Sequence, residues 1–183
     1  MTMLYSLIML LSLIHEITPF SSSSKPPDIR MPQNLRWESL NALTLATRDM
    51  QESVSFYQKL GLAITFGGSN QQFTTLSPLG DYNTQEKLYI NLFYSEDYEP
   101  PKVTGGWNGW GRCVIHVSNV DAMYDLAVLQ GGLRAEFPPR DAPWGERYFH
   151  IRDPMGHELS FAKRLDNHPR WKRDSQAQQE VIV

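Results

Sequence analysis

The most informative stretch of this chain reads Ala142-Pro143-Trp144-Gly145-Glu146-Arg147-Tyr148-Phe149-His150-Ile151-Arg152-Asp153-Pro154-Met155-Gly156-His157-Glu158-Leu159-Ser160-Phe161. Its centre, Asp153-Pro154-Met155-Gly156, is a turn sequence, because proline presets its φ angle and glycine tolerates conformations that other residues avoid. The flanking residues suit strands with one buried face. We therefore predict an antiparallel hairpin of Tyr148–Arg152 and Glu158–Lys163.

The chain contains the same unit twice, with a constant offset of 70 residues. Each copy has the end of a strand-like run, a glycine where a helix stops, and a second strand-like run. These landmarks are Thr47, Gly61 and Leu62–Phe66 in the first copy, and Val117, Gly131-Gly132 and Leu133–Phe137 in the second. Two copies are too few for a solenoid, so the sequence favours a pair of modules in one domain.

Both helices carry start and stop signals. Asp49 and Asn119 can accept a backbone N–H at the helix N-terminus, and Gly61 and Gly131 can take the left-handed conformation that ends a helix. Apolar residues recur at helical spacing in both segments, so each helix is expected to cover one face of a sheet. The predicted order is β-α-β-β-β twice, an α+β fold.

The closing Pro-Trp-Gly-x-Arg-x-Phe of Pro143–Phe149, followed by Arg-Asp-Pro-x-Gly at Arg152–Gly156, resembles the vicinal oxygen chelate superfamily. This superfamily includes glyoxalase I, extradiol dioxygenases, fosfomycin-resistance enzymes and bleomycin-resistance proteins. The resemblance extends over Asn41–Lys163. It implies two βαβββ modules, 40–94 and 110–165, joined by a linker at 95–109. Together they would form a curved, cup-shaped mixed sheet with the helices on its outer face.

The resemblance also implies where metal-using members of the superfamily hold a divalent ion. Those positions fall on Ala42, Arg112 and Ser160 and near Leu92. Alanine and leucine have no ligating atom, arginine has no acceptor, and a serine hydroxyl is a poor ligand for a hard divalent ion. We therefore expect no Zn, Ni, Fe or Mn centre and no cofactor.

Alternation along the strands predicts which side chains line the cup. The residues expected to face it are Thr44, Arg112, His116, Tyr148, His150, Glu158 and Ser160. Trp110 lies beside flexible glycines and would suit stacking on a planar ligand, although anchoring of a crossover loop is the alternative interpretation. The predicted inner surface is polar and ionisable.

Two functional interpretations of this surface and one structural interpretation stay open. In the first, the cup is metal-free, Arg112 meets an anionic group of a small-molecule ligand, and the His and Tyr side chains orient that ligand by hydrogen bonds. A pairing of Arg112 with Glu158 that merely holds the cup together is equally compatible with the sequence. In the second, His116, His150 and Glu158 form a displaced site for one divalent metal.

The resemblance favours binding over catalysis, because bleomycin-resistance proteins share the closing segment, lack the metal ligands and sequester their drug. They form dimers with swapped modules, which implies a homodimer here. His157–Ser160 departs from the drug-binding members, so bleomycin itself is not the expected ligand. The alternatives are a lyase resembling glyoxalase I or a dioxygenase-like enzyme with an atypical metal site, and a structural or regulatory subunit. Whether the protein is an enzyme stays open.

The 183 residues are 41% hydrophobic and carry a net charge of −3. This hydrophobic content suffices for one core. The sequence has no basic stripe, which argues against a nucleic-acid partner. Cys113 is the only cysteine, so no intrachain disulfide is expected and a reducing compartment is compatible.

The termini are expected to lie outside the domain, which is predicted at 38–165. Residues 1–30 contain an apolar run, Met3–Ile14, that is shorter than the roughly 20 residues of a membrane span. A targeting peptide, a membrane-associated N-terminus and a true start at Met31 stay open, so the protein is either cytoplasmic or targeted to an organelle. Residues 166–183 are expected to be a disordered tail.

Overall fold

The computed structural model describes residues 40–80, 88–104, 107–109 and 111–171. They all belong to one compact unit, Ser39–Val183. None of the helices in these ranges is long and apolar enough to cross a membrane. The expected extension 1–30 lies outside the described residues, as does 172–183 of the expected tail. Residues 166–171 are described, and Trp171 Nε1 donates a hydrogen bond to the Gly145 carbonyl at 2.6 Å.

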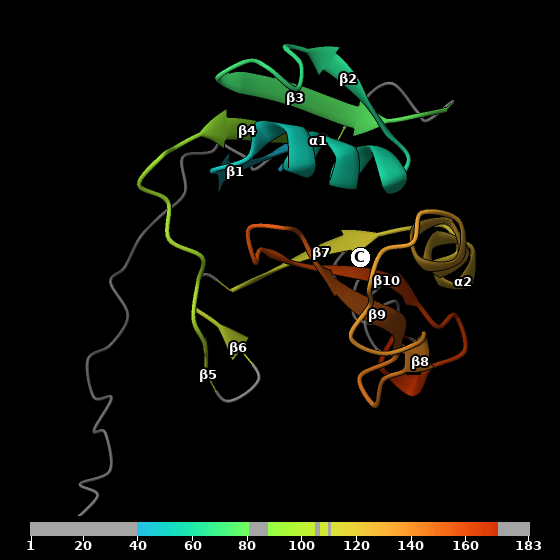
Figure 1. Ribbon diagram of the computed structural model, residues 1–183. Coiled ribbons are helices and arrows are strands. Elements are labelled where there is room, and N and C mark those ends of the chain that lie inside the picture. Colours follow the sequence, from blue (N-terminus) through green and yellow to red (C-terminus); the bar gives the residue numbers. More distant parts are fainter. Residues whose placement is uncertain (1–39, 81–87, 105–106, 110, 172–183) are drawn as a thin grey trace, which may run out of the picture. The chain divides into compact units, whose positions relative to one another are not determined.

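The first module has the predicted order, with one helix on a four-stranded sheet (Figure 1). Its elements are β1 (Ala42–Thr47), α1 (Met50–Lys59), β2 (Leu62–Phe66), β3 (Phe73–Pro78) and β4 (Tyr89–Tyr94). The strand order is β1-β4-β3-β2, with β1 parallel to β4. Asp49 caps α1 by accepting the N–H of Glu52 at 2.8 Å, and Gly61 has a φ of +83° just beyond the helix. Both predicted helix signals are confirmed.

The second module repeats this arrangement. Its elements are β7 (Arg112–His116), α2 (Val120–Tyr124), the π-helix η1 (Asp125–Gln130), β8 (Arg140–Asp141), β9 (Glu146–Arg152) and β10 (Glu158–Arg164). The strand order is β7-β10-β9-β8, with β7 parallel to β10. Asn119 accepts the N–H of Ala122 at 3.1 Å. The predicted hairpin is present as β9 and β10, and Gly156 in its turn has a φ of +84°.

Two details of the second module differ from the prediction. Gly132, with a φ of +66°, takes the left-handed conformation, whereas Gly131 has a φ of −78°. The helix ends here as a wider π-helix, and this places the end of the helix one residue later. The expected strand Leu133–Phe137 is absent apart from one bridge between Ala135 and Ile151. Pro138 and Pro139 follow it and lack the N–H groups that a ladder needs, so regular pairing resumes only at β8.

The linker 95–109 contains a small hairpin of β5 (Val103–Thr104) and β6 (Trp107–Asn108). Among the described strands, no hydrogen-bonded ladder joins the two four-stranded sheets. The modules are therefore two separate mixed sheets of one α+β domain, linked by packing.

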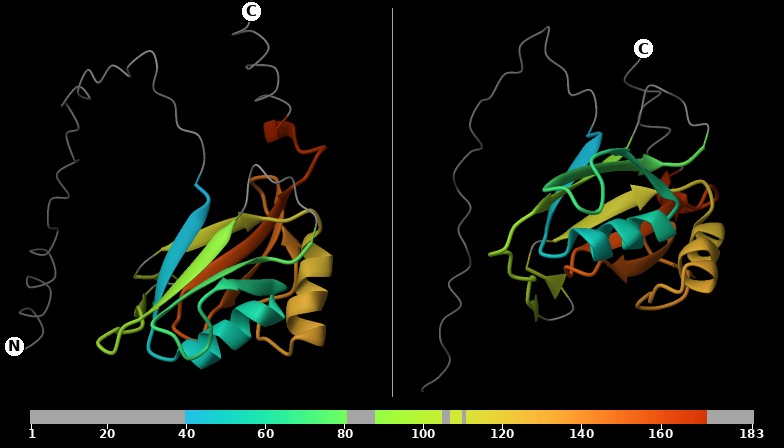
Figure 2. Two further views of the ribbon diagram at one scale, coloured as in Figure 1. Left: turned by 90° about the horizontal axis from the view of Figure 1, so that it is seen from above. Right: turned by 45° about the horizontal axis from the view of Figure 1, so that its top comes forward.

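The helix-facing sides of both sheets pack into one hydrophobic core. Its fully buried members come from both modules and include Val54, Tyr57, Leu76, Ile90, Leu92, Phe149, Ile151 and Leu159. Figure 2 shows α1 beside the helical segment of the second module in both views. The opposite face of each sheet, which alternation predicted to line the cup, therefore turns away from this core.

The turn of the predicted hairpin also ties the modules together. Asp153 Oδ2 accepts hydrogen bonds from the Tyr57 hydroxyl and His157 Nδ1, both at 2.9 Å, while Oδ1 accepts the N–H groups of Met155 and His157. The Tyr98 hydroxyl lies 2.8 Å from His157 Nε2. Burial and the nearby Asp153 carboxylate raise the pKa of Tyr57 well above its ordinary value. Asp153 thus joins α1 to the hairpin, and His157 joins the hairpin to the linker.

Candidate ligand site on the second sheet

The outer face of the second sheet carries most of the residues that the sequence assigned to the cup. Alternation places every second side chain of β7, β10 and β9 on this side. Three rows cross it: Arg112, Glu158 and Arg152; Val114, Ser160 and His150; and His116, Ala162 and Tyr148. We call this surface the polar face. The register of the three strands places six of the seven predicted cup residues in these rows.

The first row is an ionic network around Glu158, which is only 1% exposed. Arg112 Nε donates to Glu158 Oε1, and an Arg152 terminal nitrogen donates to Oε2 at 3.0 Å. The same Arg152 nitrogen lies 2.6 Å from Glu136 Oε1. Burial alone would raise the pKa of Glu158, but the hydrogen bonds from Arg152 and Arg112 outweigh it and the pKa is lowered. Arg112 is therefore paired with Glu158, the structural alternative that the sequence left open.

The second row contains a buried imidazole without a partner. His150 is 5% exposed, and its Nδ1 atom makes no hydrogen bond within the described part of the chain. Its ring lies 5.0 Å from the rings of both Phe137 and Tyr148. Burial, reinforced by the charge of Arg112, lowers the pKa of His150 to about 4. The imidazole is neutral near pH 7 and retains one donor and one acceptor nitrogen.

Arg140 is the functional candidate that sequence reasoning missed. Its Nε donates to the Tyr148 hydroxyl at 3.2 Å, and its guanidinium carbon lies 3.8 Å from the centre of the Phe137 ring. Within the described residues no carboxylate pairs with it. The one signal in the sequence is that Arg140, a cation, directly follows Pro138-Pro139. A strand at Leu133–Phe137, as expected, would not have placed Arg140 next to β9.

His116 lies at the edge of the polar face and is half exposed. Its Nε2 atom is 3.3 Å from Glu146 Oε1, and its strand partner is Ala162, four residues beyond Glu158. The described ranges contain no group of three His, Cys, Asp or Glu side chains that could hold a metal ion. The alternative ligand set of His116, His150 and Glu158 is therefore not brought together by this geometry.

The positions that the resemblance assigned to a metal also fail to supply ligands. Leu92, expected near such a position on the cup side, is instead fully buried on the helix side of its sheet. Its neighbours on the outer side are Asn91 and Phe93. Arg112 is paired with a carboxylate, and Ser160 opposes His150. These residues do not fit the divalent centre of metal-using superfamily members.

Two further predicted site residues lie apart from this group. Thr44 belongs to the outer face of the first sheet, where its hydroxyl accepts a hydrogen bond from Asn91 Nδ2 at 3.2 Å. The structure therefore does not place Thr44 with the second-sheet residues. Trp110 lies outside the described residues.

The chain belongs to the Glyoxalase/Bleomycin resistance protein/Dioxygenase superfamily, whose sequence pattern matches residues 39–161. This confirms the predicted family and explains the repeated βαβββ order. The comparison with curated proteins finds no match.

Solved structures support the same fold. A glyoxalase/bleomycin resistance protein/dioxygenase from Nocardioides has 20% identity and a TM-score of 0.54, covering 74% of this chain and 89% of its own. A bleomycin resistance determinant encoded on the transposon Tn5 has 19% identity and a TM-score of 0.53, covering 69% and 98%. A superfamily member from Sphaerobacter thermophilus has 23% identity and a TM-score of 0.51, covering 70% and 98%. At these identities the likeness establishes the fold alone.

Proposed function

We propose that this protein binds a small organic anion at the polar face, without a metal ion. The observation that carries the proposal is the placement of the buried, neutral His150 imidazole, whose Nδ1 atom has no hydrogen bond in the described part of the chain, near the Arg140 guanidinium. Arg140 donates to the Tyr148 hydroxyl but has no carboxylate partner within the described residues. A buried polar atom without a hydrogen bond costs about 1–3 kcal/mol. A bound ligand that contacts His150 would remove this cost.

The charges of the polar face favour an anion at Arg140 and not at Arg112. Glu158 and Glu136 already neutralise Arg112 and Arg152. Arg140 is exposed, and it offers a planar cation that suits a carboxylate or phosphate. The ligand's charged group would therefore approach from the solvent side of β8.

The aromatic side chains around Arg140 favour a ligand with a planar part. Phe137 lies edge-on to Tyr148, with ring centres 5.5 Å apart, and the Trp144 ring lies 5.3 Å from Tyr148. Aromatic surfaces next to a cation provide stacking and orientation for a flat organic group. Access to His150 requires Phe137 to shift, since its ring covers the imidazole at 5.0 Å.

A panel of benzoate, 1-naphthoate, phenyl phosphate and succinate tests the proposal. Thermal shift identifies a binder, and isothermal titration calorimetry then measures its Kd with wild type, Arg140→Met and the control Arg134→Met, an exposed arginine of the same segment. We expect Arg140→Met to weaken binding by about 10-fold to 100-fold, the range for a charged hydrogen bond. Equal affinity in all three proteins, or no binding by any panel compound, contradicts the proposal.

The proposed absence of a metal ion is tested separately. The lyase and dioxygenase alternatives need a metal, and no observation in the described residues favours one. Metal analysis of the purified protein is expected to find no stoichiometric Zn, Ni, Fe or Mn. One metal per chain that is lost in His116→Ala would overturn the metal-free site and favour an enzyme.

We further infer a homodimer. The outer face of the first sheet exposes three large hydrophobic side chains: Phe66, Phe73 and Phe93. Exposed apolar patches of this kind mark interaction surfaces. Light scattering of the eluting protein should give twice the chain mass, and Phe66→Ser should shift it towards monomer. A monomeric wild type would refute this inference.

A further inference from the structure

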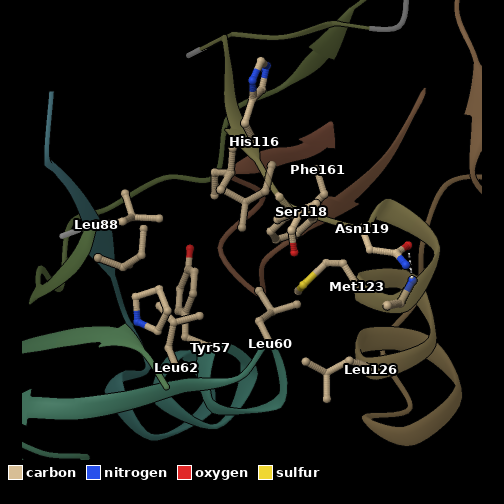
Figure 3. A pocket seen from close by; sticks show the side chains of 16 residues that line it. Tyr57, Leu60, Leu62, Leu88, His116, Ser118, Asn119, Met123, Leu126 and Phe161 are labelled. Carbon is tan, nitrogen blue, oxygen red and sulfur yellow. Dashed lines mark hydrogen bonds between the residues drawn. The ribbon is translucent and has the colours of Figure 1, made fainter. Parts of the chain in front are cut away.

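An open cavity lies on the other side of the second sheet, between the two modules (Figure 3). It has a volume of about 520 Å³. The first module contributes the end of α1, β2 and β4, and the second contributes β7, α2 and β10. Its main wall residues are Leu60, Leu62, Ile90, Ile115, Met123 and Phe161. None of the residues that carry the proposed anion site lines it.

The lining is apolar and uncharged. No Asp, Glu, Lys or Arg is found among the described residues that form its walls. His116 is the one ionisable imidazole there, and Figure 3 shows it pointing away from the centre towards its own side of β7, where it pairs with Glu146. A charged ligand would lose its hydration without gaining a partner. The cavity chemistry thus selects an uncharged molecule.

Two side chains give the cavity features of a ligand site. Ser118, which is an exposed residue, directs its hydroxyl towards the centre of the cavity in Figure 3. Met123 points its thioether across the space from α2. A thioether side chain adapts to ligands of different outline. A few polar groups in a mostly apolar wall are the usual arrangement for orienting a small ligand.

The size of the cavity argues that it is more than a packing defect. Ligand pockets range from about 300 to 1,000 Å³, and the volume of this cavity falls within that range. The cavity is open to solvent, so water contacts its apolar walls. An apolar occupant would displace this water favourably.

We propose that this cavity binds an uncharged, largely apolar small molecule whose single carbonyl or hydroxyl group hydrogen-bonds to Ser118. This site is separate from the proposed anion site and has a different ligand class. The two could be occupied together, because they lie on opposite sides of the second sheet.

Two matched probes, 2-acetylnaphthalene and 2-ethylnaphthalene, test the proposal by titration calorimetry. Ser118→Ala keeps the space and removes only the hydroxyl, so we expect the ketone to bind about threefold to tenfold more weakly and the hydrocarbon to be unchanged. Ser118→Phe places a ring where the hydroxyl points and should abolish binding of both. Leu126→Phe narrows the cavity from the helix side and should weaken both probes. Leu129→Phe, at a position 71% exposed on the same helix, is the control that should change nothing.

Failure of this proposal is distinguishable from failure of the anion site. Arg140→Met should leave the Kd of both naphthalene probes unchanged, and excess benzoate should not displace them. Saturable binding that Ser118→Phe and Leu126→Phe do not weaken, in variants whose circular dichroism and Tm match wild type, would overturn the proposal. Absence of saturable binding to the wild type would also overturn it.

Discussion

The outer faces of the two sheets differ sharply in chemistry although their modules share one element order. In the first sheet, a neutral row crosses three strands: the Thr75 hydroxyl donates to Asn91 Oδ1 at 2.9 Å, and Asn91 Nδ2 donates to Thr44 at 3.2 Å. Phe66, 65% exposed, lies on the same outer side. In the second sheet the outer face is ionic around a buried Glu158.

The difference shows what the duplicated pattern controls. Inward positions in both modules are mostly apolar because they pack into one core, and that requirement maintains the common periodicity. Outward positions escape this constraint and are free to diverge. One sheet therefore presents a hydrophobic surface, whereas the other concentrates charge and the only unsatisfied imidazole in the described residues.

The largest expected effect comes from removing the centre of the ionic row. Glu158→Leu would leave two arginines without their buried carboxylate and should lower the free energy of unfolding by about 3–5 kcal/mol. Urea denaturation measures this change in the free energy of unfolding. The double variant Glu158→Leu with Arg112→Met should recover part of the loss, because both members of that pair then become apolar. A single variant as stable as wild type would contradict the network.

The next largest effect is the pH dependence of the free energy of unfolding. It should arise in the second module, because residues 40–94 contain no histidine. The pKa of His150 is about 4 in the folded state and about 6.5 when unfolded. The unfolded state therefore binds more protons between these values, and stability falls as pH decreases through this window. Between pH 7.5 and 5 the loss should be about 2 kcal/mol. Urea midpoints for His150→Phe should show a correspondingly flatter pH profile; an identical slope would disprove the assignment.

A smaller effect is expected for the neutral row of the first sheet. Asn91→Ala removes two partly exposed hydrogen bonds and should cost about 1 kcal/mol, well below Glu158→Leu. Chemical denaturation of both variants under one condition makes the comparison. If Asn91→Ala proved as destabilising as Glu158→Leu, the two faces would be energetically equivalent and the contrast would fail.

The smallest effect on stability is expected at Arg140. Its side chain is exposed and has no carboxylate partner in the described chain, so Arg140→Met should change the free energy of unfolding by less than about 0.5 kcal/mol. A melting curve checks this. A loss above 2 kcal/mol would make Arg140 a structural residue and remove the basis of the proposed anion site.

Much of the fold was predictable because its signals are local. A cap such as Asp49 acts within three residues, and the Asp153–Gly156 turn sets a hairpin whose strands are neighbours in the chain. Alternation then assigns each side chain to one face. These signals fail where a local irregularity intervenes, as in the π-helix before Gly132 and the two prolines that follow the expected strand at Leu133–Phe137.

The sequence by itself determined the family, the paired βαβββ order, the hairpin and the side of the sheet on which Arg112, His150 and Glu158 lie. Only the tertiary structure decided that Arg112 is paired, that Arg140 is not, and that Thr44 lies elsewhere. These outcomes depend on which segments meet across the sheets, and charge pairing acts over a few ångströms between residues far apart in the chain. Periodicity reports the direction of a side chain, whereas its partner is set by packing.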